Sequence, residues 1–240
     1  MSLFQYFTPK KSKMAPLSIS NVENAHLPSL SSEFQNSNIK VVPVPEHITM
    51  GKQFATVFEN VLSPSECESW INASESAGYG IALVNVGYGV QKQIDDYRNS
   101  SRCIIDSVPA ATQLWERIKH LLPTSIKSYI PVGINERLRF LKYETNEYFA
   151  PHYDACYKRP AEHTQIGDIS YYTIMLYLNQ EEQDFTGGST RFNCSSNQPY
   201  DVQPKTGSVL IFEHNMEHSG EIVITGQKYA MRSDIMCVKQ

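Results

Sequence analysis

Two residues with metal-binding side chains lie two positions apart in the stretch His152-Tyr153-Asp154. On an extended strand, side chains at positions i and i+2 point to the same face, so His152 and Asp154 can reach one ion. A third ligand must then come from another strand, and His218 can supply it. Two neutral imidazoles and one carboxylate on one face of an octahedron are typical of non-haem Fe(II) sites that keep three coordination positions open.

A lone His-x-Asp pair is weak evidence, because such a pair is often a hydrogen-bonded turn on the surface. Lys228 makes the metal interpretation stronger. It lies ten residues after His218, a spacing that can bring the next strand back past the metal. A cation there could form a charge-assisted hydrogen bond with the far carboxylate of 2-oxoglutarate, whose other end would occupy two of the open positions. On its own, Lys228 would be interpreted as a surface lysine.

Several short motifs follow one another between about Phe54 and Cys237. They are NERLRF at 135–140, YFAPHYD at 148–154 with Tyr143 before it, LYLN at 176–179, GGSTRF at 187–192, PKTG at 204–207, HSG at 218–220 and GQKY at 226–229. In order and spacing these motifs resemble the prolyl 4-hydroxylase-like branch of the 2-oxoglutarate/Fe(II)-dependent dioxygenases. A series of ordered motifs is more specific than any one of them, so we expect the chain to be a member of this family.

The resemblance assigns roles to individual positions. It implies that iron is held by His152, Asp154 and His218, and that Lys228 pairs with the 5-carboxylate of 2-oxoglutarate. It also implies a set of residues lining the cosubstrate pocket, namely Tyr143, Tyr177 and Thr190. His214 competes for the third ligand position, but only His218 has a lysine at the family spacing. We therefore interpret His214 as a nearby polar residue.

The resemblance further implies a 2-oxoglutarate- and O2-dependent hydroxylase that releases succinate and CO2. Its substrate would be a peptidyl residue in a peptide or protein, with proline the first expectation. Collagen-modifying members of the family bind and use L-ascorbic acid, so the resemblance adds ascorbate to the possible cofactors. Those members also enter the secretory pathway. The N-terminal sequence MSLFQYFTPKKSKM has no secretory signal, which makes a collagen-type role doubtful.

Four arginines are candidates for contacts with the substrate. Arg98 lies in a stretch that forms a lid in related enzymes, and Arg159 closely follows the metal strand. Each could equally be a solvated loop residue. Arg137 and Arg139 alternate with apolar residues and therefore share one face of a strand, which could be the substrate groove or simply the polar side of a sheet. Arg232 is interpreted as structural.

The elements around these residues predict a fold that is mainly β with packed helices (α+β), with a double-stranded β-helix (jelly-roll) core. Two helices are predicted. The first starts at Ser63-Pro64-Ser65-Glu66, a capping box with proline at its first position, and runs to about Ser76; the second spans 109–122. Residues 78–100 are expected to form a long loop or loose hairpin. Strands are expected at 52–61, 137–143, 170–178, 208–212, 221–224 and 229–238.

Composition divides the chain into two parts. Residues 1–50 are rich in Ser, Asn, Pro and Lys and are expected to be a disordered N-terminal arm, and residues 51–240 to form one oxygenase domain. The stretch Pro9–Lys13 is a weak candidate for a nuclear-import patch. The net charge of −4 makes nucleic acid an unlikely partner. No apolar run is long enough for a membrane span. The five scattered cysteines favour a reducing compartment, hence a cytoplasmic or nuclear location.

Two rival functions remain open. The same iron centre could oxidise a free small molecule or a nucleic-acid base. Alternatively, the chain could be a catalytically silent jelly-roll binding module, although its three ligand positions and its lysine are all present. A peptide substrate predicts an extended groove beside residues 80–100, whereas a small molecule predicts a closed pocket there. The sequence does not specify the oligomeric state.

Overall fold

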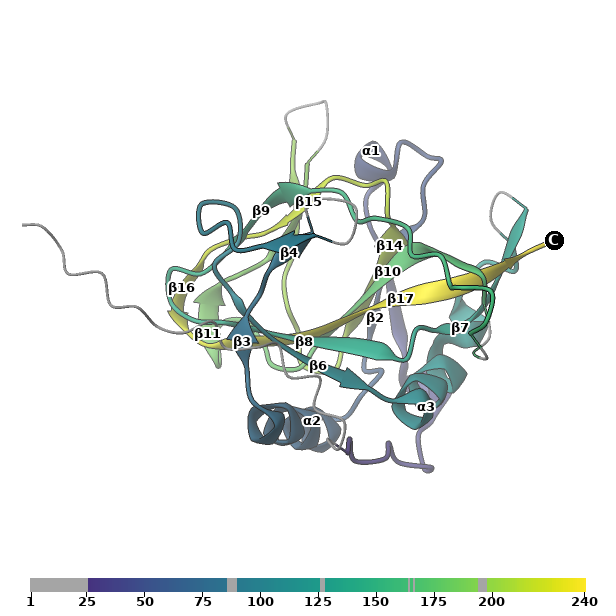
Figure 1. The fold of residues 1–240 in the computed structure, drawn as a ribbon, viewed down its shortest axis with the longest axis horizontal. Helices are drawn as coiled ribbons and strands as arrows, with labels where there is room; N and C mark the ends of the chain where they lie inside the picture. Colours follow the sequence, from purple (N-terminus) through teal and green to yellow (C-terminus); the bar gives the residue numbers. More distant parts are fainter. Residues whose placement is uncertain (1–25, 86–89, 126–127, 164, 166, 194–197) are drawn as a thin grey trace, which may run out of the picture.

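The computed structural model describes residues 26–85, 90–125, 128–163, 165, 167–193 and 198–240 (Figure 1). The basic stretch at 9–13 and Cys194 lie outside these residues, as does part of the 78–100 stretch. The four described cysteines are free. Among the described residues, no helix is both long enough and apolar enough to cross a membrane.

Strands are the dominant elements. Their bounds are β1 Lys40–Pro43, β2 Ala55–Glu59, β3 Gly80–Ile81, β4 Val84–Asn85, β5 Gln91–Lys92, β6 Ser101–Asp106, β7 Tyr129–Ile134, β8 Arg137–Tyr143, β9 Phe149–His152, β10 Ile169–Tyr177, β11 Phe185–Gly187, β12 Thr190–Phe192, β13 Tyr200–Val202, β14 Val209–Glu213, β15 His218–Gly220, β16 Val223–Gly226 and β17 Lys228–Lys239. The α-helices are α1 Glu46–Thr49, α2 Pro64–Ala77 and α3 Val108–Ile118, with short 3-10 turns at Asn36–Asn38 and Lys119–Leu121.

The largest sheet is antiparallel and has the strand order β1-β2-β14-β10-β17-β8-β6-β3, with β7 paired to the outer part of β17. The long strand β17 lies between β10, which pairs with it from Ala230 to Cys237, and β8, which pairs with it from Lys228 to Arg232. Helices α2 and α3 cover one side of this sheet (Figure 1). Trp70 of α2 and Leu114 of α3 are fully buried there, together with Phe140 of β8. This layer is the larger part of the core.

Helix α2 begins as the sequence predicts. The Ser63 side chain accepts a hydrogen bond from the backbone N–H of Glu66, and the Glu66 carboxylate accepts one from the backbone N–H of Ser63. Glu66 also forms a bidentate pair with Arg117 of α3, at 2.7 and 3.0 Å. Because Arg117 is almost fully buried, this pair ties the start of one helix to the end of the other.

A smaller sheet, with the order β13-β12-β15-β9, lies across the other side of the main sheet. Phe192 of β12 and Val202 of β13 pack with Phe212 of β14 and Tyr177 of β10, so apolar side chains fill the space between the two sheets. Two antiparallel sheets packed face to face, with helices on the outer side, match the predicted jelly-roll core and packed helices.

Residues 26–50 differ from the expected disordered arm. Strand β1 pairs with β2 at the edge of the main sheet, and the side chains of Leu27 and Leu30 are buried in the same core cluster as Trp70 of α2 and Leu114 of α3. The indole N–H of Trp70 donates a hydrogen bond to the carbonyl of Pro28 at 3.1 Å. The polar composition of this segment concealed a few apolar anchors, and the folded unit therefore begins before residue 51.

Candidate metal and cosubstrate site

The three predicted metal ligands lie together at one end of the smaller sheet. His152 ends β9 and His218 begins β15, and these two residues face each other as a register pair of neighbouring strands. Asp154 follows β9 by two residues. One ligand atom from each of the three side chains lies within 4.8 Å of the others. Strand pairing therefore brings together residues that are far apart in the sequence.

Backbone contacts fix the orientation of both imidazoles. The Nδ1 of His152 lies 2.8 Å from the carbonyl oxygen of Ala150, and the Nδ1 of His218 lies 3.1 Å from that of Met216. A carbonyl oxygen only accepts hydrogen bonds, so each Nδ1 carries the proton and each Nε2 is left with its lone pair. Burial lowers the pKa of His152 to about 4 and also lowers that of His218, so both rings are neutral near pH 7.

The carboxylate of Asp154 is held from two directions. Its Oδ1 lies 2.9 Å from Nη2 of Arg232, and its Oδ2 accepts a hydrogen bond from the hydroxyl of Thr173 and lies 3.7 Å from Nε2 of His218. Burial alone would raise the pKa of Asp154, but Arg232 and the two histidines outweigh burial and keep that pKa far below its ordinary value. Oδ2 therefore faces the imidazoles as an anion.

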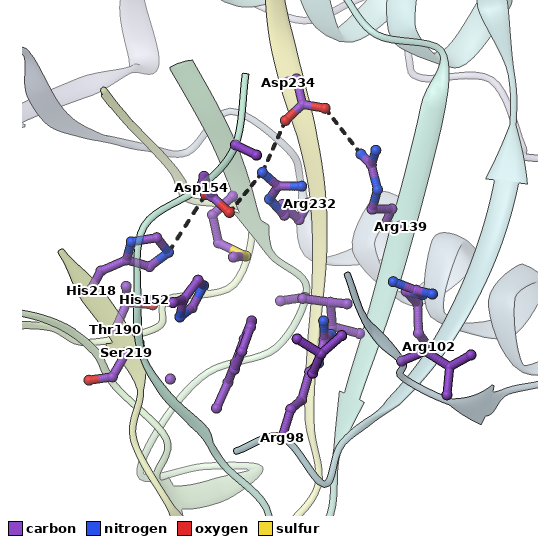
Figure 2. Close-up of a pocket in the computed structure, with 18 of the residues that line it drawn as sticks. Arg98, Arg102, Arg139, His152, Asp154, Thr190, His218, Ser219, Arg232 and Asp234 are labelled. Carbon is purple, nitrogen blue, oxygen red and sulfur yellow. Dashed lines mark hydrogen bonds and ion pairs between the residues drawn. The ribbon is translucent and has the colours of Figure 1, made fainter. Parts of the chain in front are cut away.

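Two neutral imidazole nitrogens and one anionic oxygen match the ligand set that Fe(II) takes in non-haem oxygenases. Each ligand also has a supporting partner, two backbone carbonyls for the histidines and Arg232 for Asp154, as ligands at metal centres usually do. The residues present thus fit a mononuclear Fe(II) ion. Figure 2 shows the three ligands side by side, with Arg232 linking Asp154 to Asp234.

Lys228 lies in the same cavity as the three ligands, a cavity of about 380 Å³. Its side chain is only 4% exposed, and its Nζ donates a hydrogen bond to the carbonyl of Gly188 at 2.6 Å. Nζ also lies 5.3 and 5.6 Å from the ring centres of Tyr143 and Tyr177. Burial lowers the pKa of Lys228 to about 7. Among the described residues no carboxylate lies within ion-pair distance of it, which leaves the ammonium able to receive an anion.

The three residues expected to line the cosubstrate pocket are gathered around Lys228. Tyr143 on β8 is its register partner across the sheet, and Thr190 lines the same cavity. The hydroxyl of Tyr177 donates a hydrogen bond to that of Thr190 at 2.8 Å. Tyr177 therefore lies behind Thr190 and fixes the position of its hydroxyl.

The four candidate substrate arginines fall into two groups. Arg98, Arg137 and Arg139 line the cavity. Arg159 does not: it is 8% exposed, and its guanidinium makes a bidentate pair with Glu136 at 2.6 and 2.8 Å. That pair holds the segment after β9 against the turn before β8. The structure therefore assigns Arg159 a structural contact away from the cavity.

Sequence reasoning missed several cavity residues. Arg102 was not considered, and Arg232 was interpreted as structural. Arg232 bridges Asp154 and Asp234, whose nearest oxygen is 3.1 Å away. The strand period could have revealed these residues, because Lys228, Arg232 and Asp234 occupy alternate positions of β17 and so share one face. His214 is outside the group of three ligands; its ring lies 3.7 Å from Asp234, and its carbonyl accepts the backbone N–H of Asp154.

Comparison with known families gives a match to the 2OG-Fe(II) oxygenase superfamily over residues 138–233, a range that contains all three ligands and Lys228. Among curated proteins, prolyl 4-hydroxylase 1 of Arabidopsis thaliana is 24% identical over 196 residues. The match covers 72% of this chain and 65% of that relative, so the chain spans slightly less than two thirds of its length.

Solved structures of prolyl hydroxylases share the fold. One is the viral collagen prolyl hydroxylase of Paramecium bursaria Chlorella virus-1 in its 2OG complex, with a TM-score of 0.52 and 20% identity over 77% of this chain and 96% of that one. Another is a prolyl hydroxylase from Trichoplax adhaerens in complex with a peptide fragment of the hypoxia inducible factor oxygen degradation domain. It has a TM-score of 0.56 and 14% identity over 79% of this chain and 86% of that one. These likenesses confirm the predicted fold class.

Proposed function

We propose that this chain, which matches the 2OG-Fe(II) oxygenase superfamily over residues 138–233, is a 2-oxoglutarate- and O2-dependent hydroxylase of a peptidyl residue, with proline the first candidate. The observation that carries the proposal is the placement of His152, Asp154 and His218 in one cavity with the buried Lys228. The names of the relatives support a peptide substrate, since they are prolyl hydroxylases and one was solved with a peptide.

Fe(II) held by the three ligands would supply the oxidising chemistry that places one oxygen atom of O2 on the substrate while 2-oxoglutarate is converted to succinate and CO2. The protein contributes position and charge. Lys228 would pair with the distal carboxylate of 2-oxoglutarate by a charge-assisted hydrogen bond, and Thr190 lines the same cavity. Arg232 keeps Oδ1 of Asp154 occupied, so Oδ2 is the oxygen that would hold the metal.

The aromatic ring of Phe149 stacks on the imidazole of His152, with ring centres 3.7 Å apart, and restricts how that ligand can turn.

Ascorbate is part of the proposal as an added reductant, and a cytosolic or nuclear location is supported by the free cysteines. The rival reading as a silent binding module is disfavoured, because such a module has no need of a complete ligand set beside a buried, anion-free lysine.

The test is formation of succinate from 2-oxoglutarate by anaerobically purified protein loaded with Fe(II), with and without ascorbate. Peptide libraries added to the reaction are then searched by mass spectrometry for products that have gained one oxygen atom. A His152→Ala variant serves as the matched control. Succinate that requires both iron and His152 supports the proposal; no succinate, together with no binding of 2-oxoglutarate by the metal-loaded protein, overturns it.

A further inference from the structure

Positive charge is concentrated on one wall of the cavity. Among the described residues that line it, six are cationic and only two, Asp154 and Asp234, are acidic. The cationic side chains come mainly from alternate positions of β6, β8 and β17, which point to the same face, and they are Arg98, Arg102, Arg137, Arg139, Lys228 and Arg232. Fe(II) and the 2-oxoglutarate dianion carry opposite charges of equal size, so cofactor and cosubstrate together leave this excess in place.

Some of these arginines already have carboxylate partners. Arg139 and Arg232 pair with Asp234 at 3.2 and 3.1 Å, and Arg137 pairs with Asp106 at 3.1 Å. Arg232 also pairs with Asp154 at 2.9 Å, so both acidic residues that line the cavity are already paired. Figure 2 shows the contacts of Arg232 and Arg139 as one chain that runs from Asp154 through Arg232 and Asp234 to Arg139.

Arg98 and Arg102 have no such partner: no carboxylate among the described residues lies within ion-pair distance of either guanidinium. Arg98 is 7% exposed; its Nε donates to the hydroxyl of Ser100 at 3.0 Å, and its guanidinium also contacts the hydroxyl of Tyr143. Its buried Nη2 has no hydrogen-bond partner among the described residues. Within the described part of the chain, the one hydrogen-bond acceptor of Arg102 is the side-chain amide oxygen of Gln91, at 3.3 Å. Burial and the neighbouring arginines, Arg98 first among them, lower the pKa of Arg102 to about 10.

Holding guanidinium groups together inside a cavity without a direct ion pair opposes folding, because each loses hydration and no carboxylate contacts it to offset that loss. The binding of an anionic ligand offsets this electrostatic cost. The two groups are also close to the chemistry: the guanidinium of Arg98 lies 4.6 Å from the ring centre of Phe149, and that ring stacks on His152. An anion bound by Arg98 would therefore lie one side chain away from the metal site.

We propose that the substrate is an acidic peptide segment, with carboxylate or phosphate groups close to the oxidised residue that are received by Arg98 and Arg102. Guanidinium groups suit this task because they bind carboxylates and phosphates with two parallel hydrogen bonds. The cations are confined to one cavity of a chain with net charge −4, rather than spread along a stripe, which favours a peptide over a nucleic acid. This inference rests on the proposed function and narrows its substrate class.

The test measures binding directly, by fluorescence anisotropy of labelled peptides on protein loaded with Mn(II) and 2-oxoglutarate. Three peptides share a central proline and differ only in its neighbours, which are glutamates, glutamines or phosphoserines. A labelled oligothymidylate of the same charge is the fourth probe. We expect the glutamate peptide to bind at least about tenfold more tightly than the glutamine peptide at low salt, and this advantage to shrink as salt rises.

The variants are Arg102→Gln, which changes a partly exposed side chain, and Arg98→Gln, with thermal melting as a check on folding. Arg191→Gln is the matched control, because Arg191 pairs with Asp201 and Glu221 outside the cavity. Each cavity variant should reduce the preference for the glutamate peptide about three- to tenfold, and the control should retain it. Tighter binding of the phosphoserine peptide supports the proposal and identifies phosphate as the anion.

Equal affinity for the glutamate and glutamine peptides overturns the proposal, as does a charge preference that persists in the folded Arg102→Gln variant. Tighter binding of the oligothymidylate than of every peptide also overturns it. Because binding is read without turnover, its outcome is separate from that of the succinate assay. Succinate formation with a neutral peptide preferred would defeat the acidic substrate alone, whereas charge-selective binding without any succinate would defeat the hydroxylase alone.

Discussion

The affinity of the protein for 2-oxoglutarate should fall as the pH rises from about 6 to about 8, because Lys228 changes its charge in this range. Burial lowers the pKa of Lys228 to about 7 in the absence of ligand. Its Nζ has a carbonyl acceptor but no carboxylate within ion-pair distance among the described residues. The distal carboxylate of 2-oxoglutarate supplies that charge, and it binds the protonated amine in preference to the neutral one.

The size of the effect follows from the pKa. The pKa of Lys228 falls from the ordinary lysine value of 10.5 to about 7. At 1.36 kcal/mol for each pKa unit, burying the ammonium therefore costs about 5 kcal/mol of free energy. The carboxylate of the ligand offsets this cost and returns the pKa toward its ordinary value. Binding then takes up about half a proton at pH 7, and the dissociation constant rises about tenfold between pH 6 and pH 8.

Isothermal titration calorimetry of 2-oxoglutarate into the Mn(II)-loaded protein measures the dissociation constant. Repeating it in buffers with different ionisation enthalpies also gives the number of protons taken up on binding. The metal ligands stay out of this window, since the pKa of His152 is about 4. Lys228→Arg is the matched control: arginine remains charged throughout, so its affinity should not depend on pH here. A dissociation constant that is flat from pH 6 to pH 8, with no proton uptake, would refute the reasoning.

Three further outcomes are expected. Arg232→Met removes the partner of Asp154 Oδ1 and should weaken metal binding about 10- to 100-fold in a chelator competition assay. The control variant Arg191→Gln should leave the metal affinity unchanged. An unchanged metal affinity in Arg232→Met would show that Asp154 needs no such support. Tyr177→Phe removes the hydrogen bond to the buried Thr190 and should cost about 1–3 kcal/mol in denaturant unfolding, with a raised KM for 2-oxoglutarate; an unaltered KM would separate Thr190 from the cosubstrate. Glu66→Gln breaks the pair with Arg117 and should cost about 3–5 kcal/mol at pH 7. Burial opposes the shift, but the hydrogen bond from Arg117 and those from backbone N–H groups lower the pKa of Glu66 to about 2, so its contribution is complete above pH 4.5 and is lost as the pH falls toward 2; a stability difference that does not shrink in acid would contradict this.

Local signals predicted local structure well. The capping box at Ser63 and Glu66 depends on contacts within four residues, and the helix starts where the sequence indicates. Long alternating strands were also found, and β8 has the predicted bounds. Strands such as β12 and β15 contain only three residues each, which is too short for a period to be seen, although they position Thr190 and His218. Their place is decided by pairing with distant strands.

The same distinction applies to the site. The identities of the metal ligands and of Lys228 came from motifs, but the unequal environments of the arginines came from the fold. Nothing near Arg159 in the sequence indicates its pair with Glu136, which comes from the turn before β8. Likewise, the burial of Leu27 and Leu30 depends on side chains from the two helices. Charge partners and anchors of this kind are tertiary facts, beyond the reach of a single-sequence pattern.

The position of β17 has a consequence for how the chain is made. Among the described strands it is the last in the sequence, yet it pairs with β10 on one side and β8 on the other, and it carries Lys228, Arg232 and Asp234. While the ribosome is still elongating the chain, β8 and β10 therefore have open edges facing each other and no strand to join them. The cavity is complete only after Asp234 has left the exit tunnel, because a shorter nascent chain lacks Lys228 and the Arg232 that supports Asp154. Until then the unpaired edges of β8 and β10 are exposed to wrong pairing.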